Sequence, residues 1–376
     1  MGYLLQNGGL GMAGDWIITG GRPLQGRVEL PAAKNSVLPL LAAALLCSGP
    51  VRLQNVPRLT DVEDCLALLR GVGCTAGWQG AALAVQGQPV RTDLAPEAAG
   101  RMRASILFCA PLLARLRRVS TVLPGGCRIG ARPIDLHLQG LAQMGVRQLP
   151  AAPGQLILYA PAGLRGAEIC LSFPSVGATE TLLLAAATAQ GQTVLHGAAK
   201  EPEIADLAAF LNACGGCVEG AGTDTIRVQG KRCLAGCTFT PVADRIIAST
   251  LACACAAAGG RVELTGCAPG LYAPLLEILE QMGCTVERAH DAASISRFGA
   301  LRGAGNVHTA PYPGLATDAA PLLAAVMLGA QGESSLQDRV FEHRFACAEG
   351  FAALGANVRV AERTLYVQPA VALHGE

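Results

Sequence analysis

The chain repeats one plan five times, and this repetition limits its possible folds more than any other feature. Each copy opens with a small or polar residue, continues as an almost wholly apolar run of helix length, and in most copies leads into an alternating, strand-like stretch. A second helix pattern that ends at glycine follows, as in DLAAFLNACGG and PLLEILEQMGC. The apolar runs begin about 70 residues apart, at Lys34, Arg103, Ser175, Asp244 and Thr317.

The pattern predicts an inverted α/β fold. A helix that is apolar on all sides is normally buried, whereas alternating strands leave one face of their sheet in water. We therefore expect two inside-out α/β domains, with the first helix of each unit at the centre and the sheets outside. Three contiguous units suit one lobe, 34–242, while two units and an N-terminal strand around Trp16–Leu30 suit a second, 1–33 plus 243–376. This count predicts that the second lobe is incomplete, lacking its third unit.

Composition excludes several classes of protein. Of 376 residues, 51% are hydrophobic and 15% charged, and the net charge is +1. These values argue against a disordered chain and against broad electrostatic binding to nucleic acid or an acidic membrane. The longest apolar run, Ser36–Val51, is broken by Pro39 and by Gly49-Pro50 and is too short to span a bilayer about 30 Å thick. No secretion signal opens the sequence, so we expect a cytoplasmic protein.

Fifteen cysteines in a long chain of this kind are expected to be mostly reduced, buried thiols. One group, Cys214, Cys217, Cys233 and Cys237, has a spacing within the range of a four-cysteine zinc site. The repeat places Cys217 in register with cysteines that follow the helix-ending glycine of two other units. That register favours packing at the start of a strand over zinc binding.

One glycine-rich loop, LPGGCRIGARPIDLH, carries the residue types of a reactive site. Cys127 lies between Arg128 and Arg132, whose positive charges would stabilise a thiolate and attract an anion. A loop with three glycines can move as a lid. The alternative is an inert cysteine in a loop whose arginines pair with local carboxylates, and composition alone leaves both open.

Charged residues open several of the apolar helices. Lys34 and Asn35 begin the first, Arg103 begins the second, and Asp318 lies at the start of the fifth. A helix N-terminus attracts anions, although each residue taken alone is explained more simply as a solvated side chain or an N-cap. The buried helices of a threefold lobe should start near one another. We therefore expect Lys34, Arg103, Arg132 and Asp318 to converge on an anionic substrate, with one carboxylate left as a base.

At these residues the sequence resembles the UDP-N-acetylglucosamine 1-carboxyvinyltransferases, the enolpyruvyl transferases that begin peptidoglycan precursor synthesis. The resemblance extends from about Gly20 to about Phe345, and its most specific stretches are LPGGCRIGARPIDLH and KEPEI. It implies two inside-out α/β domains with the site between them. It also implies transfer of the enolpyruvyl group of phosphoenolpyruvate to the 3-hydroxyl of UDP-N-acetylglucosamine, with release of phosphate. These two substrates are the implied partners. No cofactor, metal, nucleic acid or membrane is implied, and the associated process is cell-wall biogenesis, with cell shape, cell cycle and division.

The resemblance also implies roles for individual residues. Cys127 would donate a proton to phosphoenolpyruvate, and Asp318 would act as the base or orient the 3-hydroxyl. Lys34 would be catalytic and, with Asn35, would contact phosphoenolpyruvate. The remaining implied substrate-binding residues are Arg103 and Arg132 for anions, then Pro133, Ile134, Asp135, Leu136, Ser175, Val176, Gly177 and Val340 along the nucleotide sugar, and Arg344.

The sequence departs from the family pattern in several places. Ile247 stands where an acidic residue is usual, His343 replaces asparagine, and the last unit, which supplies further arginines, is expected to be missing. Met12 is where the family would begin. One alternative is therefore an inactive or regulatory paralogue that binds a nucleotide sugar without turnover. A 3-phosphoshikimate 1-carboxyvinyltransferase shares the fold but lacks the cysteine loop, so Cys127 counts against it.

Overall fold

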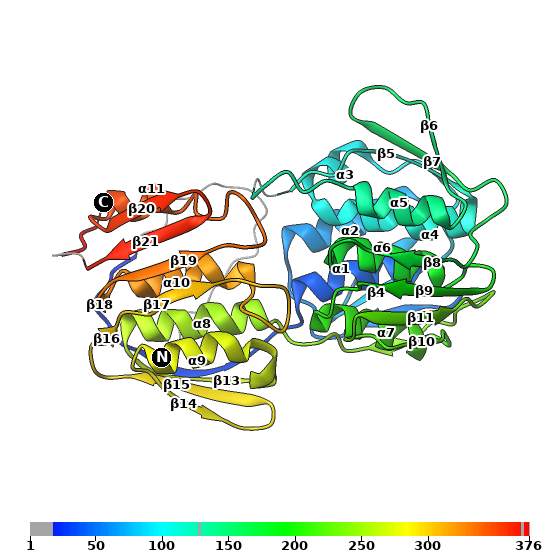
Figure 1. The fold of residues 1–376 in the computed structure, drawn as a ribbon. Helices are drawn as coiled ribbons and strands as arrows, with labels where there is room; N and C mark the ends of the chain where they lie inside the picture. Colours follow the sequence, from blue (N-terminus) through cyan, green and yellow to red (C-terminus); the bar gives the residue numbers. More distant parts are fainter. Residues whose placement is uncertain (1–17, 127–128, 370–371, 376) are drawn as a thin grey trace.

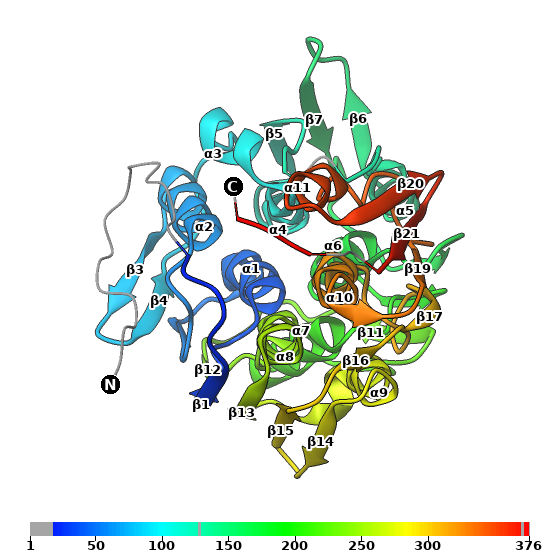
Figure 2. The same ribbon diagram turned by 90° about the vertical axis from the view of Figure 1, so that its left-hand side faces the viewer.

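The structure is a computed structural model and describes residues 18–126, 129–369 and 372–375. The chain forms two lobes that lie side by side (Figure 1). Their buried apolar side chains form two clusters, one drawn from residues between Ala32 and Leu234 and the other from Leu30 and residues between Ala248 and Val367. Viewed from the side, the helices lie in the middle and most strands toward the outside (Figure 2), which is the expected inside-out α/β arrangement.

The apolar runs form the central helices of the larger lobe. Eight of the ten residues of α1 and nine of the eleven residues of α6 are buried. Helix α4 packs against α6, and η2 packs against both α1 and α6. The central helices are α1 (Lys34–Ala43) with η1 (Ala44–Leu46), η2 (Arg103–Phe108) with α4 (Cys109–Leu116), and α6 (Val176–Ala186). The outer helices are α2 (Thr60–Gly71), α3 (Pro96–Arg101), α5 (Asp135–Gln143) and α7 (Pro202–Ala213).

Three sheets surround these helices in the described part of the larger lobe, in the orders β12-β2-β4-β3, β5-β7-β6 and β10-β11-β9-β8. Their strands are β2 (Val51–Leu53), β3 (Thr75–Gln79), β4 (Ala82–Gln86), β5 (Arg118–Val122), β6 (Arg147–Leu149), β7 (Gln155–Tyr159), β8 (Glu168–Cys170), β9 (Gln192–His196), β10 (Val218–Glu219), β11 (Thr225–Gln229) and β12 (Thr238–Phe239). Strand β12, from the third unit, pairs in parallel with β2 of the first. This pairing closes the lobe into a ring of units.

The smaller lobe repeats the plan with two helices at its centre, which pack against each other. These are α8 (Arg245–Ala258) and α10 (Ala320–Met327), the latter preceded by η4 (Thr317–Ala319). Around them lie η3 (Pro269–Tyr272), α9 (Ala273–Gln281) and α11 (Ala348–Ala353). Only seven of the fourteen residues of α8 are buried, so the predicted burial on all sides is wrong for this helix. It is covered by α10, β13 and β15 but keeps exposed positions such as Thr250.

The described strands of this lobe form sheets with the orders β1-β13-β15-β14, β17-β19-β21-β20 and β16-β18. They are β1 (Leu24–Glu29), β13 (Gly260–Thr265), β14 (Thr285–Arg288), β15 (Ala292–Arg297), β16 (Leu301–Arg302), β17 (Gly305–His308), β18 (Ala330–Gln331), β19 (Ser334–Gln337), β20 (Asn357–Ala361) and β21 (Thr364–Gln368). All six residues of β1 are exposed, which contradicts the expected alternation. Among the described strands, β1 lies at the edge of its sheet with β13 as its single neighbour, so little of its surface is buried.

The chain crosses between the lobes twice, and the two crossings run beside each other. Ala32 and Ala243 form an antiparallel bridge. Its flanks are held by the Ala33 N–H, which donates to the Val242 carbonyl over 2.7 Å, and by the Asp244 N–H, which donates to the Pro31 carbonyl over 2.9 Å. Within the residues described, no helix combines the length and apolarity needed to cross a membrane.

Candidate functional site

Three of the predicted site residues stand at the starts of central helices in the larger lobe. Lys34 is the first residue of α1, Arg103 is the first residue of η2, and Ser175 is the N-cap of α6. Because η2 packs against both α1 and α6, these helix starts belong to one packed group. This packing brings the three helices together, and the convergence of Lys34, Arg103, Arg132 and Asp318 on an anion stays a prediction.

The Lys34 side chain is engaged with a carboxylate that the sequence did not single out. Its Nζ lies 3.0 Å from Oδ2 of Asp61, and both side chains remain about two-fifths exposed, at 43% and 37%. The N-cap of α1 is Ala33, without a side-chain cap, so Asn35 is not the cap and its side chain is exposed. Because an acidic residue in the first turn of a helix is ordinary, Asp61 has no distinguishing signature in the sequence.

Arg103 and Arg132 lie close enough to affect each other. Burial, and then the positive charge of Arg132, lower the pKa of Arg103. The Arg103 guanidinium also donates a hydrogen bond to the carbonyl of Pro133, over 2.9 Å. Arg132 has a φ of +43°, in the left-handed region. Two neighbouring cations favour a bound anion, since it offsets their mutual repulsion.

Cys127 and Arg128 lie outside the described residues, so the proton-donor role stays a prediction. The residues beside them join the two lobes. On one side, a Cβ at Gly126 would lie 3.2 Å from the backbone N of Arg103. On the other, the carbonyl of Ile129 accepts the N–H of His343 over 3.0 Å. Gly126 therefore lies against the start of η2, and Ile129 is bonded to the 339–344 segment of the smaller lobe.

The predicted nucleotide-sugar segment surrounds a buried histidine. Ser175 Oγ accepts the N–H of Ala178 over 3.3 Å, and a Cβ at Gly177 would lie 3.1 Å from Cε1 of His137. Nδ1 of His137 lies 2.8 Å from Oγ1 of Thr181. Burial, and then the charge of Arg103, lower the pKa of His137 to about 4, so the ring is neutral at pH 7. His137 belongs to the LPGGCRIGARPIDLH motif, but the sequence alone does not predict its contact with Thr181.

The other predicted positions of this segment lead into α5. Ile134 is its N-cap and Asp135 its first residue, and Pro133 is fixed through its carbonyl by Arg103. Asp135 and Pro133 are exposed, and Ile134, Leu136 and Val176 are half-buried.

The smaller lobe gathers its predicted residues around an ion pair. A nitrogen of Arg344 pairs with the Asp318 carboxylate, and Nε of Arg344 donates to the carbonyl of Thr317 over 2.8 Å. The Thr317 hydroxyl donates to Asp338 over 2.5 Å. Asp338 is fully buried, and its Oδ1 also accepts the N–H of Val340 over 2.8 Å. Asp318 and Val340 are thus positioned by one network, whose buried member Asp338 has no signature in the sequence alone.

One aromatic ring links the two groups. The guanidinium carbons of Arg132 and Arg344 each lie 5.7 Å from the ring centroid of Phe341, within reach of a cation–π interaction. Arg103, Arg132, Asp318, Arg344 and Val340 are therefore brought into one neighbourhood across the two lobes. The Lys34 ammonium pairs with Asp61 rather than with this group, and its backbone N–H is held by Asp244 at the crossing between the lobes.

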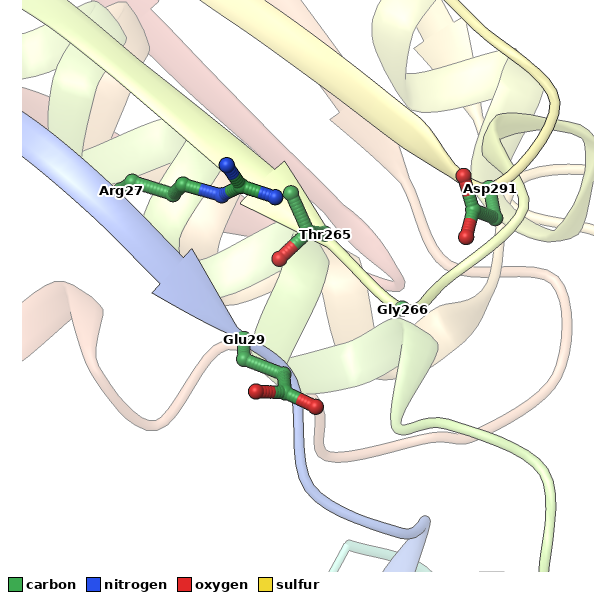
Figure 3. Close-up of a pocket in the computed structure, with 5 residues that line it drawn as sticks. All are labelled: Arg27, Glu29, Thr265, Gly266 and Asp291. Atoms are coloured by element: carbon green, nitrogen blue, oxygen red, sulfur yellow. The ribbon is translucent and has the colours of Figure 1, made fainter.

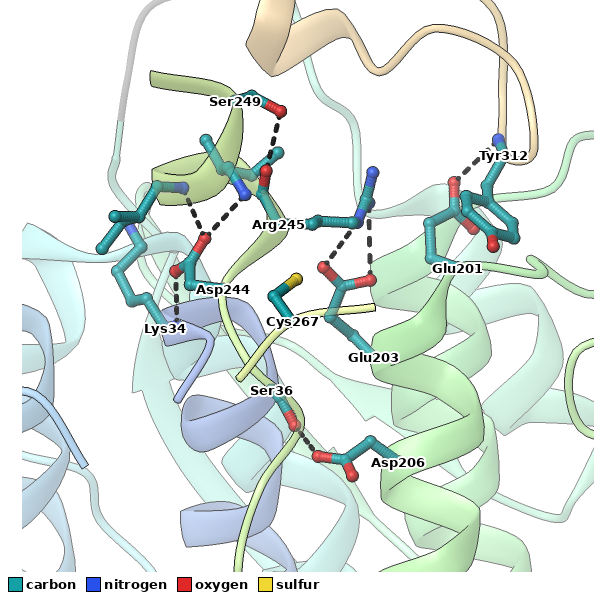
Figure 4. Close-up of polar contacts among 12 residues, drawn as sticks. Lys34, Ser36, Glu201, Glu203, Asp206, Asp244, Arg245, Ser249, Cys267 and Tyr312 are labelled. Atoms are coloured by element: carbon teal, nitrogen blue, oxygen red, sulfur yellow. Dashed lines mark hydrogen bonds and ion pairs between the residues drawn. The ribbon is translucent and has the colours of Figure 1, made fainter. Parts of the chain in front are cut away.

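The KEPEI and ADRI stretches meet at the junction of the lobes (Figure 4). Nε of Arg245 lies 3.2 Å from Oε1 of Glu203, with both side chains at most one-tenth exposed. Asp244 caps α8 and its Oδ2 accepts the backbone N–H of Lys34 over 3.1 Å. Ile247, the departure from the family pattern, packs against the core of the smaller lobe, which is why an apolar residue fits there.

A separate hollow of about 480 Å³ lies at the end of β1, lined by Arg27, Glu29, Thr265, Gly266 and Asp291 (Figure 3). None of the predicted site residues that the structure describes lines it. Elsewhere, Cys214 and Cys237 lie in contact, but the described residues contain no group of three or more His, Cys, Asp or Glu that could hold a metal ion.

Comparison with known proteins agrees with this architecture. The family model described as EPSP synthase (3-phosphoshikimate 1-carboxyvinyltransferase) matches residues 18–376. The chain belongs to this family of carboxyvinyltransferases. Within it, a relative from Caulobacter sp. (strain K31), named UDP-N-acetylglucosamine 1-carboxyvinyltransferase, is 44% identical over 91% of this chain and 80% of its own length. A relative of the same name from Maricaulis maris is also 44% identical, over 92% of this chain and 82% of its own length. The family resemblance in the sequence is thereby confirmed.

Solved structures show the same fold. The enolpyruvyl transferase NikO from Streptomyces tendae matches with a TM-score of 0.81 at 26% identity, covering 93% of this chain and 83% of NikO. EPSP synthase from Acinetobacter baumannii matches with a TM-score of 0.69 at 18% identity, covering 94% of this chain and 83% of its own. The expected fold class is confirmed by both.

Proposed function

We propose that this chain transfers the enolpyruvyl group of phosphoenolpyruvate to the 3-hydroxyl of UDP-N-acetylglucosamine and releases phosphate. The observation that supports it most is the position of Arg132 of the larger lobe and Arg344 of the Asp318–Arg344 pair over the same Phe341 ring, with Arg103 close enough to Arg132 for their charges to interact. The reaction needs cations for a phosphate-bearing intermediate and a carboxylate for a sugar hydroxyl. The relatives named for this activity, at 44% identity, point to the same substrates.

The proposed chemistry assigns a task to each group. Cys127 gives a proton to C3 of phosphoenolpyruvate, and Asp318 takes the proton of the 3-hydroxyl as its oxygen bonds to C2. Loss of phosphate and of a C3 proton then yields the enol ether. Arg103 and Arg132 neutralise the anions, and Lys34 joins them when substrate displaces Asp61 from its ammonium.

We further propose that the nucleotide sugar lies along Arg132, Pro133, Ile134, Asp135 and Leu136. The other proposed contacts are Asn35 with phosphoenolpyruvate, and Ser175, Val176, Gly177, Val340 and Arg344 with the nucleotide sugar. The lobes would be 34–242 and 1–33 plus 243–376. The setting would be the cytoplasm, in peptidoglycan synthesis and hence in cell-wall biogenesis, cell shape, cell cycle and division.

Phosphate release from the purified chain with both substrates tests this proposal. Shikimate 3-phosphate, offered in place of the nucleotide sugar, is the control acceptor and should give no release. The Cys127→Ala variant should lose turnover, whereas Cys127→Asp should retain part of it, because a carboxylic acid can also donate a proton. Full turnover in the alanine variant would remove Cys127 from the reaction.

The second candidate function is that of a nucleotide-sugar-binding protein without turnover. Measurements on the same sample distinguish it from the transferase. UDP-N-acetylglucosamine should raise the melting temperature in either case, since a ligand of the folded state stabilises it. Stabilisation without phosphate release would overturn the transferase proposal in favour of the binding protein.

A further inference from the structure

Three cysteines that the proposed reaction does not use meet in the larger lobe. The sulfur of Cys214 lies 3.3 Å from that of Cys237 and 3.7 Å from that of Cys47. All three are free thiols, and Cys47 and Cys214 are buried while Cys237 is half-buried. Cys47 follows the last turn of the first central helix, and Cys214 is the C-cap of α7. The cluster is therefore built from the first and third units at the ends of helices whose opposite ends face the smaller lobe.

Regular backbone contacts hold these cysteines in place. The Ala235 N–H donates to the Cys214 carbonyl over 2.8 Å, and the Arg52 N–H donates to the Cys237 carbonyl over 2.8 Å. Cys47 forms a parallel bridge with Leu234. Glycine at 236 permits the close approach, because a Cβ there would lie 2.0 Å from the carbonyl oxygen of Pro50. The nearness of the sulfurs thus follows from the sheet and its neighbours rather than from a loose loop.

We propose that Cys214 and Cys237 are a redox modification site that a peroxide converts to a disulfide. The half-buried Cys237 thiol reacts first: the O–O bond of hydrogen peroxide breaks, the sulfur becomes a sulfenic acid, and one water leaves. The Cys214 thiol then attacks that sulfur. The S–S bond forms, the S–OH bond breaks, and the hydroxyl leaves as a second water with the Cys214 proton. Two thiols and one peroxide thereby give one disulfide and two waters.

The short separation of the two sulfurs favours this step. A disulfide is about 2.05 Å long, so the two sulfurs must approach by about 1.2 Å from their 3.3 Å separation. Rotation of the two side chains supplies such a shift. Burial, and then the neighbouring Cys214 thiol, raise the pKa of Cys237 to about 12. The thiolate is therefore scarce at neutral pH, and the reaction should be slow and should accelerate as the pH rises.

Tryptic mapping tests the proposal, because the two sulfurs fall in different peptides. Cys214 belongs to 201–227 and Cys237 to 233–245, each of which holds one further cysteine. The full-length Cys217→Ser/Cys233→Ser variant leaves a single cysteine in each. This protein is treated with hydrogen peroxide, its remaining thiols are alkylated, and it is digested without reductant. The expected product is the 201–227 and 233–245 pair, linked and two hydrogens lighter, which dithiothreitol separates.

Further variants in the same background make the result decisive. Cys214→Ser and Cys237→Ser should each abolish the linked pair while leaving the melting temperature of the reduced protein within a few degrees. Peroxide should raise that temperature in the parent variant but not in either serine variant, because the cross-link ties α7 to the segment entering β12. Cys170, exposed on β8, reports general oxidation.

Two outcomes would overturn the proposal. One is recovery of both peptides unlinked and alkylated, or oxidised only to sulfonic acid, when Cys170 is already fully oxidised. The other is a link only between 35–52, which holds Cys47, and 201–227. None of these readouts depends on transferase activity, so they stand apart from the proposed function.

Discussion

Asp318 and Arg344 form an ion pair in which the arginine side chain is 9% exposed and the aspartate side chain 42% exposed. A buried cation thus fixes a carboxylate that still reaches water. The Arg344 side chain also holds the carbonyl and the hydroxyl of Thr317, over 2.8 and 3.0 Å. This arrangement suits a base that must meet a substrate hydroxyl at a set position.

Replacing Arg344 by glutamine should lower kcat for phosphate release by about 100-fold, because Asp318 loses its positioning partner. The effect should fall on kcat more than on KM for phosphoenolpyruvate. The matched control is Arg339→Gln, an exposed arginine of the same segment that bonds to Gln337. Equal losses in the two variants would contradict a positioning role for Arg344.

Asp338 should prove critical for stability as well as for the site. It is fully buried and accepts the N–H groups of Val340 and Phe341 over 2.8 and 2.7 Å. Asp338→Ala leaves these donors unpaired and should cost about 2–4 kcal/mol in urea unfolding. Asp338→Asn keeps an oxygen acceptor and should recover part of that loss. If Asp338→Ala left the free energy of unfolding unchanged, water would have replaced the carboxylate.

The buried pair of Arg245 and Glu203 joins the lobes, and breaking it from one side should be severe. Arg245→Met leaves the Glu203 carboxylate buried without its cation and should cost about 3–5 kcal/mol. The double variant Arg245→Met/Glu203→Leu should be much less affected, because no buried charge remains. A double-mutant cycle by chemical denaturation measures this difference, and strictly additive losses would refute it.

His137 should make the protein sensitive to acid. Its pKa falls to about 4 in the folded protein from an ordinary 6.5, so the unfolded chain binds the proton more readily between these values. Stability is therefore full above about pH 6.5 and declines by about 3 kcal/mol as the pH falls to 4. His137→Gln should flatten this part of the pH–stability curve. An unchanged slope in the variant would assign the acid sensitivity to other groups.

Glu180 should have the opposite effect of His137 on stability, lowering it as the pH rises. Burial, and then the charges of Glu203 and Glu201, raise its pKa well above the ordinary value. The folded protein thus holds a proton that the unfolded chain releases as the pH rises above about 4.5, and stability falls as the pH increases. Glu180→Gln should have a higher melting temperature than the parent at pH 8, with a smaller gain at pH 5. The exposed Glu219 on β10, changed to glutamine, should show no such trend.

The sequence predicts the repeat, its central helices and the inside-out class because apolar helices of this length must be buried. It could not predict the exposed strand β1 or the half-covered α8, since cover depends on which elements pack alongside. Helix starts singled out Arg103 and Asp318, the cysteine loop singled out Arg132, and the family resemblance added Val340; their roles stay predictions. The partners of these residues could not be predicted in this way.

The unforeseen partners share a physical cause. Asp61, Asp338 and Phe341 are ordinary residues of turns and helix starts until the tertiary fold brings them to a cation or a backbone donor. The contact of Cys214 with Cys237 is similar: the spacing suggested a metal, whereas the strands place only two sulfurs in close contact and a third nearby. Long-range pairing of this kind has no local pattern.

The parallel pairing of β12 with β2 has a consequence while the chain is being synthesised. The Leu53–Phe239 pairing cannot form until the ribosome has released a stretch of nearly two hundred further residues, so one edge of the earliest sheet stays bare through most of translation. Contacts between residues so far apart in the sequence slow folding, and they prolong the exposure of apolar surface and unpaired strand edges that are prone to aggregation. A nascent chain of this protein should therefore depend on a ribosome-associated chaperone until its third unit has been synthesised.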